Sequence, residues 1–100
     1  MTETIAEYPF TLDHPSLKGH FPGNPVIPGV VILNKVLETI SAEKSLKTYR
    51  IVSAKFQNPL IPPAVMTVQI TEQSANRYNY KAMAEETVIS NGIIEILKNE

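Results

Sequence analysis

Alternation of apolar and polar side chains with a period of two marks four stretches of this chain as strands with one buried face. A fifth run, residues 87–97, is rich in Ile and Val and predicts another strand. Pro9 lies within the first stretch and favours an edge strand there, because proline has no N–H to pair. The alternating apolar positions are Ala6, Tyr8, Phe10 and Leu12; Val52, Ala54 and Phe56; Met66, Val68 and Ile70; and Tyr78, Tyr80, Ala82 and Ala84.

The dipeptide Asn91-Gly92 is a strong hairpin signal, but a turn there would cut the last run into two short pieces. We therefore expect the turn at Glu85-Glu86 and one long strand after it. Within that strand, Gly92 is expected to be a bulge or a point of close approach.

A helix is predicted from Gly29 to Ser41. Pro28 stands next to its first turn, where proline is favoured. The helix is apolar around most of its circumference, so we expect other elements to wrap it. Its apolar residues recur at helical spacing: Val30, Val31, Leu33, Val36, Leu37 and Ile40.

The order of elements is one strand, a proline-rich loop, a buried helix and four more strands. One apolar helix against about five antiparallel strands predicts an α+β fold. The chain has 100 residues, of which 43% are hydrophobic and 19% charged, and this predicts a single domain over residues 1–100. A chain this short buries a small share of its surface, so dimer formation is expected to stabilise it.

Charge and composition exclude several classes of function. The net charge of -1 and a pI of about 6.1 argue against nucleic-acid binding, and no basic cluster marks a membrane surface. The chain has no cysteine, so disulfides and thiolate metal sites are excluded. We also expect no membrane span and no signal peptide, which makes a cytoplasmic location the default.

His20 is the candidate for acid–base chemistry. It lies in the stretch 19–30, where three prolines and three glycines constrain the backbone and hold one side chain in place. Its unperturbed pKa, about 6.5, suits proton transfer near neutral pH. The free N–H groups at the helix start, on Gly29 and Val30, could polarise a carbonyl while the imidazole removes a proton alpha to it.

The segment Gly19-His20-Phe21-Pro22-Gly23-Asn24-Pro25-Val26-Ile27-Pro28-Gly29-Val30 resembles the signature of the beta-hydroxyacyl-(acyl carrier protein) dehydratases of the FabA/FabZ type. That signature reads G-H-F-P-G-x-P-x-x-P-G-V, and every fixed position is present. The segment Lys55 to Pro63 resembles the family's second conserved segment. The resemblance implies a hotdog fold, in which a curved antiparallel sheet wraps a central helix, and the short chain resembles compact accessory dehydratases.

The resemblance also implies roles for individual residues. His20 would be the base at the alpha carbon, and the N–H of Gly29 would bind the thioester carbonyl. The substrate would be a 3-hydroxyacyl thioester of acyl carrier protein or coenzyme A, and the protein a homodimer or an oligomer of dimers without metal or cofactor. The expected substrate-binding residues are Phe21, Pro22, Gly23, Ile27, Pro28, Val30 and Phe56.

One residue departs from the family pattern. The family's acid, which faces the histidine across the dimer interface, stands five residues after the helix-start glycine, and this sequence has Asn34 there. An amide can hydrogen-bond a hydroxyl but is no ordinary proton donor. His20 could act as both base and acid. The alternatives are a non-catalytic acyl-binding or partner subunit, and a hotdog thioesterase.

Other candidate residues have plainer interpretations. Glu38 lies one turn beyond Asn34, too far along the helix to replace the acid directly, and is expected at the surface or in a dimer contact. His14 is expected to be a structural turn residue, and Tyr78 and Tyr80 are expected to pack within the sheet. Two histidines without a nearby acid pair make a weak metal site.

Overall fold

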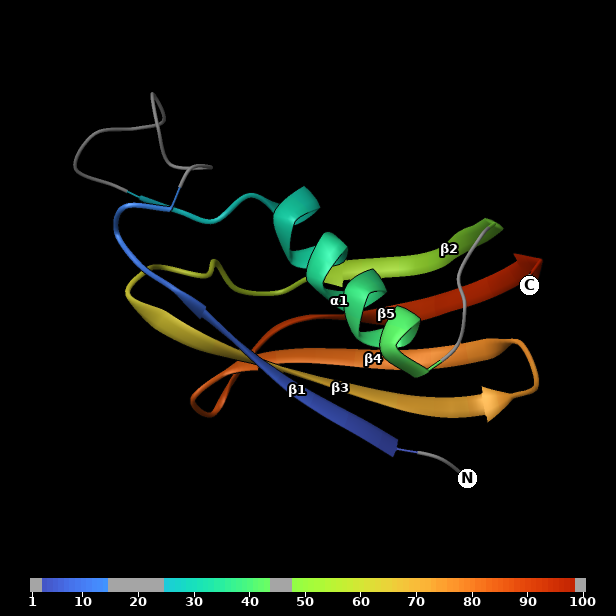
Figure 1. Ribbon diagram of the computed structural model, residues 1–100. Coiled ribbons are helices and arrows are strands. Elements are labelled where there is room, and N and C mark those ends of the chain that lie inside the picture. The colour runs from blue at the N-terminus through green and yellow to red at the C-terminus, as the bar shows by residue number, and fades with distance from the viewer. Residues whose placement is uncertain (1–2, 15–24, 44–47, 99–100) are drawn as a thin grey trace.

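The computed structural model describes residues 3–14, 25–43 and 48–98. Within them, five strands and one helix follow the order that the sequence pattern predicts. Figure 1 shows the helix α1 lying across one face of the sheet. The elements are β1 (Glu3–Phe10), α1 (Gly29–Glu43), β2 (Thr48–Phe56), β3 (Ala64–Ser74), β4 (Arg77–Ala84) and β5 (Thr87–Lys98).

The five strands form one antiparallel sheet in the order β1-β3-β4-β5-β2. Strands β1 and β2 are its edges, so the edge position predicted from Pro9 is confirmed. The α+β architecture, one central helix on a curved antiparallel sheet, is confirmed as well.

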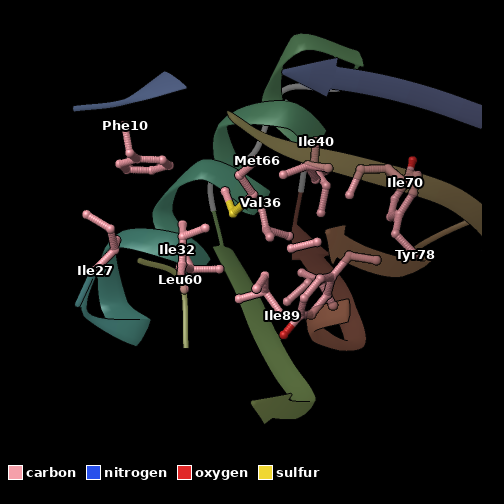
Figure 2. Packing of buried hydrophobic residues seen from close by; sticks show 14 of the residues in the cluster. Phe10, Ile27, Ile32, Val36, Ile40, Leu60, Met66, Ile70, Tyr78 and Ile89 are labelled. Atoms are coloured by element: carbon pink, nitrogen blue, oxygen red, sulfur yellow. The ribbon is translucent and has the colours of Figure 1, made fainter. Parts of the chain in front are cut away.

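The core lies between the helix and the sheet. Ile32, Val36 and Ile40 are spaced by four residues, so they share one face of α1, and all three are buried. Figure 2 shows this row extending along the core from Ile32 to Ile40. The buried hydrophobic side chains are Phe10, Ile27, Ile32, Val36, Ile40, Leu60, Met66, Val68, Ile70, Tyr78, Tyr80, Ala82, Ile89, Ile94 and Ile96.

A polar contact fixes α1 against the edge strand β1. The Tyr8 hydroxyl and the buried Thr39 hydroxyl are 2.7 Å apart, and Thr39 also donates to the carbonyl of Lys35 over 2.8 Å. The Lys35 ammonium lies 5.1 Å from the centre of the Tyr8 ring, a cation–π distance. The same ammonium contacts Glu38 over 3.3 Å. These contacts set the position of the helix relative to β1.

The predicted turn between the last two strands is confirmed. Ala84 pairs with Thr87, and Glu85 between them has a φ of 57°. The strand β5 then continues unbroken through Gly92, so the hairpin signal at Asn91-Gly92 is overridden.

Gly92 is a point of close approach, which is one of the two roles the sequence predicts for it. It pairs with Tyr80 on β4 and with Ala54 on β2. A Cβ atom at Gly92 would overlap the Ser53 carbonyl oxygen and come within 2.8 Å of the Tyr80 ring. Only glycine allows this approach, because the first of these atoms belongs to the backbone of β2.

Two boundaries differ from the prediction. The helix ends at Glu43 rather than Ser41, since neither Ser41 nor Ala42 interrupts it. Leu12 was wrongly placed in the first strand. Pairing of β1 with β3 ends at Phe10, and Leu12 is exposed in the turn that follows.

That turn has its own hydrogen bonds. The His14 N–H donates to the Thr11 carbonyl over 3.2 Å, and the Thr11 hydroxyl donates to the Asp13 carboxylate, which lowers the pKa of that carboxyl. The His14 ring lies 5.1 Å from the Phe10 ring. These contacts are those of a turn residue packed on the core.

Among the described residues, no helix is long and apolar enough to span a membrane.

Replacing Gly92 with alanine tests the close approach to β2. The new methyl group would meet the Ser53 carbonyl, so we expect the free energy of unfolding to fall by about 1–3 kcal/mol, as for an overpacked core. Gly29→Ala is the matched control, because its new methyl group meets only the ring tip of Phe56, which can rotate. Chemical denaturation of both variants provides the measurement. Equal stability of Gly92→Ala and wild type would contradict the contact.

Candidate active site

The first turn of α1 forms one wall of the candidate site. Its first hydrogen bonds run from the N–H groups of Val31 and Ile32 to the carbonyl of Pro28, over 3.0 and 3.3 Å. The N–H groups of Gly29 and Val30 precede these, at positions that have no partner within a helix. They also carry the positive end of the helix dipole. The helix therefore presents two donors at its start.

The aromatic ring of Phe56 lies directly against this helix start. A Cβ atom placed on Gly29 would come within 3.0 Å of Cζ and 3.1 Å of Cε1 of that ring. Because Gly29 has no Cβ, the ring packs on the backbone itself. Phe56 ends the edge strand β2 and is 49% exposed.

An apolar pocket of about 400 Å³ opens beside this contact. Ile27 and Leu60 line it from the two proline-bearing loops, and the Ile27 N–H donates to the Leu60 carbonyl over 2.9 Å. Figure 2 shows Ile27, Ile32 and Leu60 grouped at one end of the core. The described lining residues are Val26, Ile27, Gly29, Ile32, Phe56, Gln57, Asn58, Pro59 and Leu60.

Hydrogen bonds to β5 fix the chain where β2 ends. The Gln57 N–H donates to the Ile89 carbonyl over 2.9 Å, and the Asn58 side-chain amide donates to the Val88 carbonyl over 2.8 Å. These bonds hold the segment after Phe56 against the sheet, and so they hold the wall of the pocket opposite the helix.

A buried polar pair lies on the inward face of the sheet near this wall. Ser90 pairs with Phe56 across β5 and β2, and its hydroxyl is 2.8 Å from the hydroxyl of Tyr80. Both side chains are buried. Burial raises the pKa of Tyr80, and the hydrogen bond to Ser90 opposes that shift. The predicted packing role of Tyr80 is confirmed, as is that of Tyr78.

The structure brings some of the predicted site residues together. Ile27, Gly29 and Phe56 line one pocket, and half-buried Pro28 lies between the first two along the chain. The predictions for His20, Phe21, Pro22 and Gly23 fall outside the described residues.

Two predicted residues stand apart from the pocket within one chain. Val30 is 65% exposed and Asn34, one turn further on, is also exposed. Neither is among the residues that line the pocket. Glu38 continues the same side of the helix one more turn, is exposed and pairs with Lys35, as expected of a surface residue.

Sequence reasoning missed six lining residues: Val26, Ile32, Gln57, Asn58, Pro59 and Leu60. Segment 55–63 located the loop that carries four of them, but which side chains enter the pocket depends on the hydrogen bonds to β5. In the described part of the chain, no group of three or more His, Asp or Glu side chains could hold a metal ion.

Comparison with known proteins gives the family. Residues 1–93 match the family model of the ApeI-like proteins, described as ApeI dehydratase. The chain is a member of this dehydratase family. FabZ 3-hydroxyacyl-(acyl-carrier-protein) dehydratases are relatives: that of Brucella melitensis biotype 1 is 37% identical over 87 residues, and that of Caulobacter vibrioides strain NA1000 is 32% identical over 88.

These alignments cover 75% of this chain and 55% of each relative, so the chain spans about half the length of the FabZ proteins it matches. Among solved structures, the dehydratase heterocomplex ApeI:P from Xenorhabdus doucetiae matches with a TM-score of 0.77 and 22% identity. That match covers 93% of this chain and 85% of the other.

The fluoroacetyl-CoA thioesterase FlK matches with a TM-score of 0.68 and 13% identity, over 94% of this chain and 82% of that one. Together, these structures show that the ApeI-like chain has the hotdog fold predicted for it.

The Tyr80–Ser90 pair behind the pocket wall can be tested with a double-mutant cycle. Tyr80→Phe leaves the buried Ser90 hydroxyl without this partner, and we expect a loss of about 1–3 kcal/mol in the free energy of unfolding. Ser90→Ala should cost a similar amount. The double variant should cost less than the sum, because neither hydroxyl then remains unpaired. Additive losses in chemical denaturation would contradict the coupling.

Proposed function

We propose that this chain removes water from 3-hydroxyacyl thioesters to give trans-2-enoyl thioesters. The supporting observation is the apolar pocket at the start of α1, which Gly29 and Phe56 line. An acyl chain needs apolar walls, and a thioester carbonyl needs N–H donors at the point where negative charge develops. The FabZ relatives act, by name, on 3-hydroxyacyl groups of acyl carrier protein.

The proposed reaction assigns His20 as the base. Its imidazole takes the proton from the alpha carbon, and the electron pair moves onto the thioester oxygen as an enolate. That pair then returns to form the double bond to the beta carbon as the bond from that carbon to the hydroxyl breaks. His20 gives its proton to the departing hydroxyl, which leaves as water. The N–H of Gly29 donates to the thioester oxygen, which carries the charge between these steps.

Substrate binding involves the residues around this point. Ile27 and Phe56 form the apolar walls, and the motif residues Phe21, Pro22, Gly23 and Pro28 are the further residues that we propose bind the substrate. Val30 and Asn34 are exposed on one side of α1, and we propose that a second chain covers them and contributes to the same tunnel.

That second chain pairs through the edge strand β2. Several large apolar side chains of this strand, among them Tyr49, Ile51 and Val52, are exposed, which is unusual for an edge strand that stays in water. A second copy of the chain, joined along β2, would bury them and extend the sheet.

The substrate carrier is acyl carrier protein or coenzyme A.

Asn34 favours a second candidate function, a subunit that binds acyl thioesters without dehydrating them. General acid catalysis contributes about 10²–10⁴-fold, which an amide at the acid position cannot supply in the ordinary way. His20 would have to return its own proton to the leaving hydroxyl. The ApeI:P structure is named as a heterocomplex. In this second function, the chain would therefore pair with a different subunit that catalyses the reaction.

Replacing His20 with alanine tests the first function. We expect turnover of a 3-hydroxyacyl thioester to fall by about 10²–10⁴-fold or more, while the melting temperature changes by only a few degrees, because a loop histidine contributes little packing. Tyr8→Phe, which lies in the β1 contact away from the pocket, is the matched control. Unchanged turnover in His20→Ala would remove this residue from the mechanism.

Replacing Asn34 with aspartate distinguishes the two functions. The new carboxyl group would restore a proton donor, so we expect dehydration to rise above wild type if the amide limits the reaction. Asn34→Leu, which removes all hydrogen bonding at this position, is the control and should be slower than wild type. Acyl-thioester binding without turnover in wild type and Asn34→Asp would favour the non-catalytic subunit.

A further inference from the structure

A hollow of about 490 Å³ lies on the face of the sheet opposite α1. Strand residues alternate between faces, and Tyr80 and Ala82 point inward, so Lys81 between them points outward. Gly92 pairs with Tyr80, so both residues face inward and line the outer hollow only through their backbone, which forms its floor here. The described lining residues are Ser53, Lys55, Gln57, Gln69, Thr71, Asn79, Tyr80, Lys81, Asn91, Gly92 and Ile93.

One row of side chains crosses four strands beside this floor. Lys55 on β2 pairs with Asn91 on β5, Asn91 pairs with Lys81 on β4, and Lys81 pairs with Gln69 on β3. Two strand spacings separate the lysines, which is about 10 Å. Between them Asn91 accepts a hydrogen bond from the Gln57 side chain over 3.4 Å, which leaves its NH₂ group as a donor.

The hollow is positively charged. None of its described lining residues is acidic, and no ion pair between described residues uses Lys55 or Lys81. Two carboxylates on the neighbouring strands are engaged by other side chains: Glu3 accepts from Gln69 over 2.6 Å. The other, Glu95, lies between Arg50, at 2.5 Å, and Arg77, at 3.8 Å. Charge and donors therefore favour an anionic ligand.

The hollow and the candidate active site meet at one residue. Gln57 lines both, because it follows Phe56 at the end of β2, where the sheet stops. A molecule with its acyl group in the pocket at Gly29 could therefore pass around the end of β2 and place its other end in the hollow.

We propose that this hollow binds the nucleotide end of a coenzyme A thioester. That end carries a diphosphate and a separate phosphate on the ribose. Two separated anionic groups can each contact one of the two lysines, which lie about 10 Å apart, whereas a single anionic group contacts only one of them. The arm of a carrier protein has a single phosphodiester. The proposal rests on the dehydratase function and names coenzyme A as a carrier that this chain accepts.

Binding is tested with adenosine 3′,5′-bisphosphate, which carries the ribose phosphate and the first phosphate of the diphosphate, by calorimetry and by NMR of the backbone amides. We expect shifts at Lys81 and Asn91, and an affinity that falls with salt. Lys81→Gln should weaken binding roughly fivefold, the upper range for an exposed ion pair. Asn91→Asp, which places a carboxylate between the lysines at nearly constant size, should weaken it further.

Lys35→Gln is the matched control, because it makes the same charge change on α1, on the other face of the sheet. It should bind the bisphosphate as wild type does. Inorganic phosphate is the second probe and should bind much more weakly than the bisphosphate. Equal weakening by Lys35→Gln, or equal binding of the two probes, would overturn the proposal.

Kinetics separate this proposal from the dehydratase function. Lys81→Gln should raise KM for a 3-hydroxyacyl-coenzyme A and leave kcat unchanged, with no effect on the same acyl group carried on N-acetylcysteamine, which has no phosphate. If both substrates turn over with equal KM values that Lys81→Gln does not change, that result would overturn the nucleotide site and would leave the dehydratase function supported. If neither substrate turns over, the function fails, and the binding titration still decides the site.

Discussion

The packing of one helical face on the concave side of the sheet is the interaction on which this structure depends. Ile32, Val36 and Ile40 form that face, and the helix packs on the strands β1, β3 and β4. This packing fixes where the helix begins. Its first turn comes to lie at the end of β2, so Gly29 meets Phe56 and the apolar pocket forms between them. The packing of the core therefore determines where the N–H donors proposed for catalysis lie.

The same packing leaves the opposite face of the helix uncovered. Val30 and Asn34 lie on that face, and the edge strand β2 exposes apolar side chains beside it. A sheet of five strands can wrap a helix from one side only. The substrate tunnel we propose therefore needs a second chain. In that tunnel, Asn34 of one chain faces the pocket of the other chain rather than the pocket of its own.

Local chemistry in the sequence predicted much of the fold. Proline at position 9 marked an edge strand, and the length of the last apolar run outweighed the Asn91-Gly92 turn signal. Leu12 shows where alternation misleads: the pattern continues past Phe10, but the partner strand β3 does not. Strand order could not be predicted from the sequence, because period-two alternation indicates which face is buried and not which strand is the neighbour.

The sequence also predicted part of the candidate site. The signature around residues 19–30 identified Gly29 and Ile27, and segment 55–63 identified Phe56. Leu60 could not be singled out, because its inward position follows from the hydrogen bond that Ile27 donates to it across two loops. The hollow on the outer face was also missed, since Lys55 and Lys81 are 26 residues apart in sequence and become neighbours only through the register of three strands.

The most direct test of the central claim, that two chains build one active site, is complementation between two defective variants. His20→Ala and Asn34→Leu are unfolded together, refolded as a mixture and assayed for dehydration of a 3-hydroxyacyl thioester. If His20 of one chain works with Asn34 of the other, each mixed dimer regains one intact site, and the mixture recovers about a quarter of the wild-type rate. A mixture no more active than the average of the two separate variants would contradict the claim, as would full activity of Asn34→Leu alone.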